Sequence, residues 1–293
     1  MTPKSAGDLD PLVVRLQALA EESRDLKEAA TVYRAILPLL RYEELHVTPV
    51  SLTREQARAS LKAGSPLLSS VDFEIDIEAV RDLMIRLACA LESFSEEAAL
   101  RRADAARAIR LAIEADALDI SSILSLIGAG ERCAMATLAH ELQLDPNLLW
   151  TLGQNALKPA LRTLCRALSP LVEGVPWDKG YCFICGAGAT LGELQQNDQI
   201  KHLRCGQCGA DWPFRRLHCM YCGNEDHRTL SYLYEESRRE KMRIEVCDKC
   251  KGYLKVIASF APTPPEMLPV EDLATLHLDH VAEDHGYARV AIR

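Results

Sequence analysis

Apolar residues recur at three- and four-residue spacing through most of residues 10–170, a pattern typical of successive amphipathic helices. Two of these helices carry clear start signals. Asp76 precedes a buried stripe and can cap its first turn. Asp145 followed by Pro146 supplies a cap and then a proline at the first helical position. Because no strand-like alternation interrupts the run, the sequence predicts an all-α domain over residues 1–175.

The pattern changes in the last part of the chain. Residues 242–246 alternate apolar and polar side chains, as a half-buried strand does, and residues 230–234 suit a hairpin partner. Aromatic residues gather here too, since 10 of the 16 lie within residues 177–260. Of the 11 cysteines, 8 lie between Cys182 and Cys250. This segregation indicates a second, different architecture after the helical domain.

These eight cysteines form four CxxC pairs, which are Cys182/Cys185, Cys205/Cys208, Cys219/Cys222 and Cys247/Cys250. Both sulfurs of a CxxC turn can reach one ion, and two such turns complete a tetrahedron with bonds of about 2.3 Å. Sequential pairing is favoured because 19 residues separate the first pair from the second and 24 separate the third from the fourth, enough for a short hairpin in each case. The spacing therefore predicts two metal sites of the ribbon type, each with four cysteine ligands.

The residues around the pairs support metal binding. Gly186, Gly209 and Gly223 each follow the second cysteine of a pair, where the turn benefits from a positive φ, and Lys251 takes this place in the fourth. Modules of this size cannot bury enough apolar surface to fold alone. A bound metal, contributing on the order of 10 kcal/mol or more, would replace the missing core.

We therefore expect a mainly α, multidomain protein. The helical domain over residues 1–175 is followed by small β modules over 176–215 and 216–260, and by a proline-rich linker with a short acidic C-terminal helix over 261–293. That last helix is expected to be solvated, because its histidines match no strong ligand pattern. The isolated cysteines are expected to be ordinary core residues. They are Cys89, Cys133 and Cys165.

Spacing alone does not choose between zinc and mononuclear iron, because both accept four thiolates in a tetrahedron. A zinc-ribbon adaptor, including one that binds nucleic acid, is one interpretation. The charge does not favour nucleic acid, since the whole chain carries −8 at pH 7 and residues 182–251 are nearly balanced before the thiolates are counted. A rubredoxin-type electron carrier that activates a client enzyme is another interpretation.

Several functions are not expected from the sequence. The chain shows no catalytic triad order and no phosphate-binding loop, and four thiolates would close each metal site to substrate, so we do not expect an enzyme. It contains no secretion signal and no run of roughly 18 apolar residues, so we expect a cytoplasmic protein without membrane insertion. The oligomeric state is not predicted.

The residues around the four pairs resemble a known family. The similarity covers roughly residues 176–290 and rests on the four CxxC pairs together with Tyr181, His202, Trp212, Arg216, Leu230, Tyr232, Glu245, Tyr253, Leu254, Lys255, the run from Glu271 to Leu276, and the run from Gly286 to Arg289. In these features the chain resembles the FdhE family of formate dehydrogenase accessory proteins.

The resemblance implies a chaperone-like assembly and maturation factor for respiratory formate dehydrogenase, which contacts the catalytic subunit in the cytoplasm before that subunit is exported. It implies a helical domain followed by two rubredoxin-like modules. It also implies two iron ions, each held by one set of four cysteines, in place of structural zinc, which is otherwise the default interpretation of such sites.

Exposed aromatic and arginine side chains on a metal-stabilised module are natural anchors for a partner protein. Trp212, Arg215 and Arg216 lie between the two predicted sites, and Tyr234 and Arg238 border the predicted hairpin turn. We predict these five as candidate contacts for the catalytic subunit. The simpler alternative is that Trp212 and Tyr234 cover a thin ribbon core and that the arginines are solvated.

Overall fold

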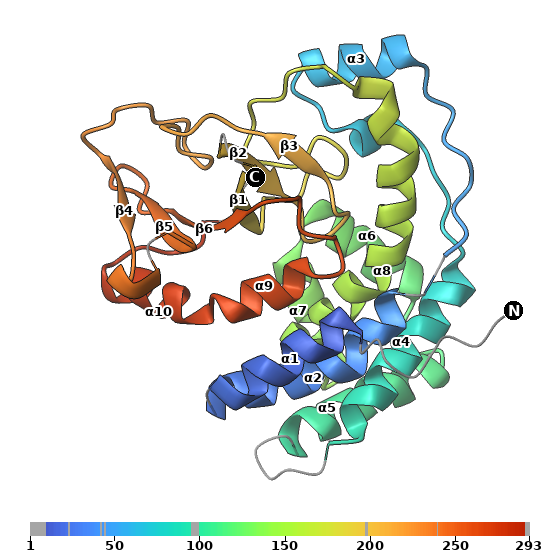
Figure 1. Ribbon diagram of the computed structural model, residues 1–293. Coiled ribbons are helices and arrows are strands. Elements are labelled where there is room, and N and C mark those ends of the chain that lie inside the picture. The colour runs from blue at the N-terminus through green and yellow to red at the C-terminus, as the bar shows by residue number, and fades with distance from the viewer. Residues whose placement is uncertain are drawn as a thin grey trace, which may run out of the picture.

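The computed structural model describes residues 10–22, 24–41, 43, 45–94, 100–196, 199–238 and 240–290. Within them, the predicted all-α region is confirmed (Figure 1). Its helices are α1 (Pro11–Glu22), α2 (Arg24–Arg41), α3 (Arg54–Lys62), α4 (Ile77–Glu92), α5 (Leu100–Glu114), α6 (Ile120–Ala129), α7 (Arg132–Glu141) and α8 (Pro146–Leu168), with 3-10 turns η1 (Leu67–Ser70) and η2 (Ser169–Val172).

The predicted helix starts form as expected. The Asp76 carboxylate accepts a hydrogen bond from the Ala79 backbone N–H at 3.0 Å, at the start of α4. The Asp145 carboxylate accepts one from the Leu148 backbone N–H at 2.8 Å, before α8. Each cap satisfies a backbone donor that the first turn leaves without an intrahelical partner.

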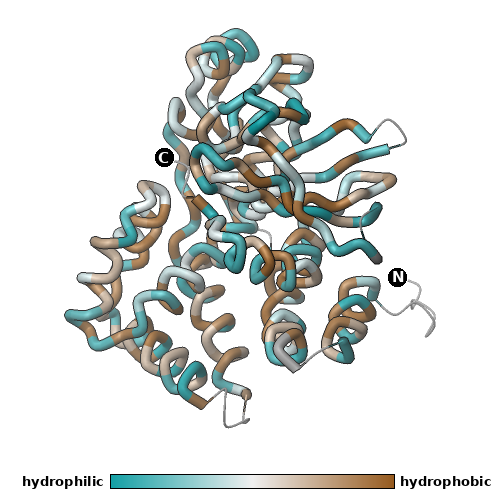
Figure 2. Tube along the Cα trace, turned by 90° about the vertical axis from the view of Figure 1, so that its left-hand side faces the viewer, coloured by the Kyte–Doolittle hydropathy of each residue, from teal (hydrophilic) through white to brown (hydrophobic). Residues whose placement is uncertain are grey.

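Helix α8 lies at the centre of the helical domain and contacts α2, α4, α5, α6 and α7. One stripe of its residues is fully buried against them, among them Leu149, Leu152, Ala156 and Ala160. Along the other helices, apolar and polar residues are interspersed, as expected for helices that pack with one side (Figure 2). The last turns of α8 leave this core and run along the cysteine-rich region.

The cysteine-rich region forms a single six-stranded sheet in the order β3-β2-β1-β6-β5-β4. Its strands are β1 (Leu191–Gln195), β2 (Ile200–Arg204), β3 (Asp211–Pro213), β4 (Leu230–Leu233), β5 (Met242–Cys247) and β6 (Tyr253–Ser259), with a 3-10 turn η3 (Glu236–Arg238) after β4. The predicted hairpin is confirmed as the antiparallel pair of β4 and β5. The two halves join where β1 pairs with β6 in parallel, so one sheet runs through both predicted modules, and their boundary at residue 215 stays a prediction.

Two short helices follow the sheet, α9 (Leu268–Ala274) and α10 (Leu276–Asp284). Val270 and Leu273 of α9 are buried in the core of the helical domain, beside α1 and α2 (Figure 1). Helix α10 packs on β5 and β6. The C-terminal segment therefore connects the helical domain to the far half of the sheet.

The expectation of a solvated acidic C-terminal helix was wrong. Asp279 is 9% exposed, and its carboxylate lies 2.6 Å from the ammonium of Lys255, which is 1% exposed. Asp272 pairs with the same ammonium at 2.8 Å. A buried lysine needs such partners, because burying an unpaired charge is costly. Asp272 and Asp279 are therefore part of the packing, and of the acidic residues described there only Glu283 and Asp284 at the end of α10 are exposed as expected.

Two of the three isolated cysteines also differ from expectation. Cys165 is buried, as predicted, but Cys89 and Cys133 are exposed. At Cys89 the neighbours Leu87 and Ala88 face the core, so the cysteine one position further points to solvent, whereas Cys133 lies between the exposed Arg132 and Ala134 in the first turn of α7. Within the described residues, no helix has the length and apolar character needed to cross a membrane.

Candidate metal centres

The first four cysteines come together on two turns, one before β1 and one between β2 and β3. The Sγ atoms of Cys182 and Cys208 lie 3.4 Å apart, and those of Cys185 and Cys205 lie 3.6 Å apart. A tetrahedron with metal–sulfur bonds of about 2.3 Å has edges of about 3.8 Å, so these spacings fit four ligands of one ion. Neither pair is bonded as a disulfide.

The second four cysteines repeat this arrangement in the other half of the sheet, on turns before β4 and between β5 and β6. Their Sγ atoms lie 3.6 Å apart in Cys219 and Cys250, and 3.8 Å apart in Cys222 and Cys247. Within each group of four, all sulfurs lie within 4.8 Å of one another. The structure thus brings together the eight predicted ligands in the two predicted sets.

All four CxxC turns have the same backbone geometry. The residue after each second cysteine donates its N–H to the carbonyl of the first cysteine, at 2.8 to 3.0 Å. That residue has a positive φ in every turn, 78° at Gly186, 80° at Gly209, 69° at Gly223 and 57° at Lys251. The prediction from glycine placement therefore holds, and Lys251 adopts the same left-handed conformation despite its side chain.

The chemistry of the donor set fits a metal ion. Burial raises the pKa of Cys182 and of Cys219, so these thiols resist ionisation on their own. Burial also opposes ionisation of Cys247, but the backbone N–H of Cys250 and the Asn224 amide point at its sulfur and lower its pKa to about 7. A central cation would supply the charge that keeps four thiolates together. Zinc and iron both satisfy this description.

The two groups differ in their surroundings. In the first, Cys182, Cys205 and Cys208 are at most 2% exposed, whereas Cys222 of the second is exposed to solvent. The turn that carries the first group is bonded to the helical domain, because the backbone N–H of Leu67 donates to the carbonyl of Phe183 at 2.9 Å. The first site is therefore internal and the second peripheral.

The predicted partner contacts do not all lie on the surface. Trp212 is 2% exposed, its indole N–H donates to the Lys179 carbonyl at 3.0 Å, and its ring meets Phe183 edge-on. Its burial agrees with the simpler alternative, in which Trp212 covers the ribbon core, because the side chain fills the space beside the first cysteine group. Arg215 is exposed and pairs with Glu225 at 2.7 Å. The others, Arg216, Tyr234 and Arg238, are also exposed.

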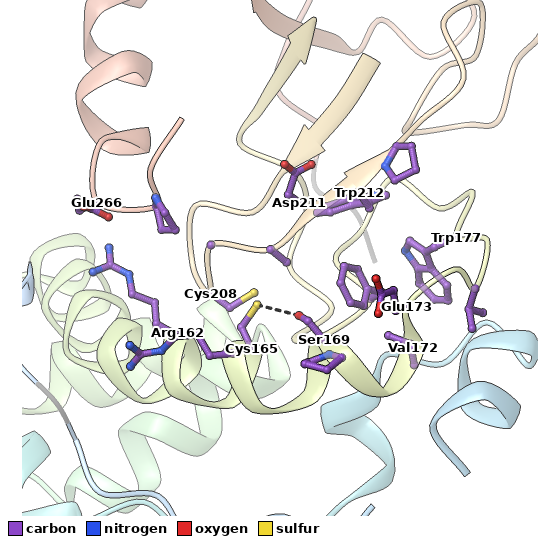
Figure 3. A pocket seen from close by; sticks show the side chains of 18 of the residues that line it. Arg162, Cys165, Ser169, Val172, Glu173, Trp177, Cys208, Asp211, Trp212 and Glu266 are labelled. Atoms are coloured by element: carbon purple, nitrogen blue, oxygen red, sulfur yellow. Dashed lines mark hydrogen bonds between the residues drawn. The ribbon is translucent and has the colours of Figure 1, made fainter. Parts of the chain in front are cut away.

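Sequence reasoning missed a cavity of about 960 Å³ beside the first cysteine group (Figure 3). Its walls come from α8 and η2 on one side and from the turn that carries Cys208 and strand β3 on the other. These segments are far apart in the sequence, so no local pattern could place them together. The only local sequence feature that relates to the cavity is the presence of Arg162 and Arg166 four residues apart on α8. By themselves these two arginines resemble an ordinary solvated helix face.

Together, the fold and the two clusters define a helical protein that carries a pair of four-cysteine metal-binding ribbons in one sheet. Residues 217–293 match the family model described as "FdhE, C-terminal domain". These findings confirm the resemblance to the FdhE family that the cysteine motifs predict.

Relatives and a solved structure agree. The chain is 29% identical to the "Protein FdhE homolog" of Aquifex aeolicus over 137 residues, which are 46% of this chain and 47% of that protein. It is 35% identical to the homologue of Stutzerimonas stutzeri over 117 residues, 39% of this chain and 37% of that protein. The matched part is thus less than half the length of these relatives. The crystal structure of the FdhE protein from Pseudomonas aeruginosa has the same fold, with a TM-score of 0.61 and 23% identity over 96% of this chain and 92% of that one.

Proposed function

We propose that this protein is a non-enzymatic accessory factor that binds the catalytic subunit of a respiratory formate dehydrogenase in the cytoplasm, before export. We further propose that each four-cysteine cluster holds one iron ion. The observation that carries the proposal is the pair of closed four-thiol clusters in one sheet, in a chain that matches the FdhE family.

The ligand set supports a structural role for the ions. Four cysteines complete a tetrahedron, so no position remains for a substrate or a water molecule. An ion at each centre would hold two CxxC turns together. It would thereby fix the position of the exposed residues next to those turns. An iron ion would in addition be able to exchange one electron, whereas zinc would not.

The proposed contact residues are Arg215, Arg216, Tyr234 and Arg238, which are all exposed. Arg215 and Arg216 come shortly before the second cluster in the chain, whereas Tyr234 and Arg238 lie at the end of the β4–β5 hairpin that is remote from Cys247. Arg216 also lines a small hollow together with Tyr232, which is 39% exposed, so arginine and aromatic side chains share one rim. Such side chains provide much of the binding energy in many interfaces.

Metal analysis and visible absorption of the purified protein test the iron assignment. We expect two irons per chain and a thiolate-to-iron charge-transfer band. A colourless protein with two zinc ions would contradict iron and would leave the accessory role standing. Reversible bleaching at a physiological potential would indicate an electron carrier in place of a static support.

A binding titration with the purified catalytic subunit tests the partner. We expect the charge-reversed variant R215E/R216E to bind at least about 10-fold more weakly than the native protein, with its metal content unchanged. The matched control is R101E/R102E, which reverses two adjacent exposed arginines on α5. Equal affinity of R215E/R216E and the native protein would exclude this surface, and no binding by the native protein would contradict the proposed function.

A further inference from the structure

The cavity beside the first cluster lies between a helix and the edge of the sheet (Figure 3). Strand β3 is the last strand on its side of the sheet, and all three of its residues line the cavity. The facing wall is the C-terminal half of α8 followed by η2. A groove between an edge strand and a helix is a geometry in which extended peptides bind, because the peptide can add a strand to the sheet.

The backbone of β3 leaves hydrogen-bonding groups on this open edge. The Cys205 N–H donates to the Ala210 carbonyl at 2.9 Å, and the Phe214 N–H donates to the Lys201 carbonyl at 2.8 Å. In an antiparallel ladder the direction of these groups alternates with each residue, so the N–H and carbonyl of Asp211 point away from β2. An added extended segment would pair with them. Pro213 limits how far that pairing can extend.

Two arginines line the helix wall one turn apart. The guanidinium of Arg162 donates to the Leu40 carbonyl at 3.3 Å, and that of Arg166 donates to the Thr163 hydroxyl at 3.3 Å. Among the described residues, neither has a carboxylate within 4.0 Å, and the buried Nε of Arg162 has no hydrogen-bond acceptor. Burial lowers the pKa of Arg162, which reflects the cost of this poorly compensated charge.

Four acidic residues among those described also line the cavity, and the charge of one of them, Glu266, partly offsets the lowering of the Arg162 pKa by burial. Asp211 is directed to His202 and Arg204, and Glu266 lies 4.0 Å from Arg41. Glu173 lies on the lining at the opposite end, beside Val172 and Trp177 (Figure 3). In the described part of the chain, the cavity therefore has two arginines along α8 with no carboxylate within 4.0 Å, whereas its other end carries apolar side chains and one acidic residue.

From these features we infer that the cavity binds an extended, acidic peptide segment of the partner protein. Its backbone pairs with Asp211 on the edge of β3, and an acidic group is held by Arg162 and Arg166. An apolar side chain of the same segment occupies the end lined by Val175 and Trp177. This inference rests on the proposed function, because the partner is taken to be the catalytic subunit.

A binding titration with the purified catalytic subunit tests the role of the arginines. We expect R162E/R166E to weaken binding at least about 10-fold, because it places two negative charges where an acidic segment is held. The control R54E/R58E reverses two exposed arginines with the same spacing on α3, and it should change affinity less than about twofold. If R162E/R166E fails to fold, R166E alone is used, since Arg166 is exposed and should still weaken binding about threefold or more.

The outcomes separate this inference from the proposed function. Native affinity in the arginine variants, with native binding intact, overturns the inference and leaves the function. Absence of binding by the native protein contradicts the function, and the inference falls with it. A photo-crosslinking residue at Val175 adds a direct measurement. We expect it to attach to an Asp- or Glu-containing segment of the subunit, and attachment only within this chain or to a second copy would overturn the inference.

Discussion

The two cysteine clusters have the same internal geometry and very different surroundings. Each CxxC turn contains the same type of backbone hydrogen bond and one residue in the left-handed conformation. The Sγ atoms that pair across the two turns of a cluster lie 3.4 to 3.8 Å apart. Yet the first cluster is buried between the sheet and the helical domain, whereas the second has a solvent-exposed ligand in Cys222. The local CxxC sequence sets the arrangement of the ligands, and the tertiary packing sets how much of the protein depends on each ion.

The clusters are also anchored in different ways. The first is fixed by direct contact, since Phe183 and Ile184 accept backbone hydrogen bonds from η1 and lie in one apolar cluster with Leu61 and Leu168. Of the described residues, the second contributes only Met220 and the partly buried Tyr221 to that apolar cluster, and its half of the sheet is also connected to the helical domain through α9 and α10. Ions at the two sites should therefore differ in their effect on overall stability.

The largest expected difference concerns loss of one ligand. Cys205→Ser and Cys222→Ser should each leave one metal ion per chain. C205S should also lower the free energy of unfolding of the helical domain by more than about 4 kcal/mol, because it leaves buried thiols without their cation inside a shared core. C222S should lower it by less than about 1 kcal/mol, because its surroundings are already open to solvent. Elemental analysis and thermal unfolding followed by far-UV circular dichroism measure both quantities. Equal destabilisation by the two variants would show that the surroundings do not matter.

A smaller loss of stability is expected from a change at Asp279 on α10, the helix that packs on β5 and β6. Asp279→Asn removes a carboxylate that contacts the buried Lys255 and accepts a hydrogen bond from the Tyr253 hydroxyl at 2.6 Å. We expect a loss of about 2–3 kcal/mol, below the full cost of breaking a buried pair because Asp272 remains beside the lysine. The control is Asp284→Asn on the exposed side of the same helix, which should have no measurable effect.

The difference in the free energy of unfolding between the native protein and D279N should depend on pH. Burial opposes ionisation of Asp279, but hydrogen bonds from Lys255 and Tyr253 outweigh it and hold its pKa below the ordinary value. A lowered pKa in the folded state stabilises the protein above the unfolded-state pKa, near 4, and this stability is lost as the pH falls through the folded pKa. The difference between the native protein and D279N should therefore stay constant down to about pH 5 and shrink below about pH 4. A pH-independent difference in denaturant titrations would contradict this origin.

The smallest expected effect compares two equivalent glycines. At Gly209, with a φ of 80°, an added Cβ would lie 2.7 Å from the Cβ of Pro265. At Gly223, with a φ of 69°, the nearest atom is the His218 Nε2 at 3.8 Å. Gly209→Ala should thus cost about 2–3 kcal/mol from strain plus a clash, and Gly223→Ala about 1 kcal/mol from strain alone. Chemical denaturation measures both. Equal costs would mean that Pro265 moves aside freely.

Features with local causes could be predicted from the sequence. Helix caps at Asp76 and Asp145, the β4–β5 hairpin and both sets of four cysteines depend on residues within about one element of each other or on a fixed spacing between turns. The glycines at the turns have an equally local cause, a backbone conformation that side chains disfavour.

Features that depend on distant segments could not be predicted. The sheet is continuous because residues 192–195 pair with 256–259, and no pattern in either segment specifies that partner. The sequence leaves two interpretations of Trp212, a surface anchor or a cover of the ribbon core, and only its contacts with Lys179 and Phe183 decide for the second. The acidic C-terminal residues resemble a solvated face until the buried Lys255 is placed against them.

The position of α9 has a consequence for synthesis of the protein. Val270 and Leu273 complete a core that also contains α1 and α2, which leave the ribosome long before residues 268–274. Until residues 268–274 emerge, the nascent chain presents the apolar faces of those helices without their final cover. Strand β1 likewise can pair with its second neighbour, β6, only after residues 253–259 have been synthesised. Helices and CxxC turns can therefore form early in synthesis, but the core is complete only after α9 has been synthesised. A chain truncated before α9 should need chaperone protection.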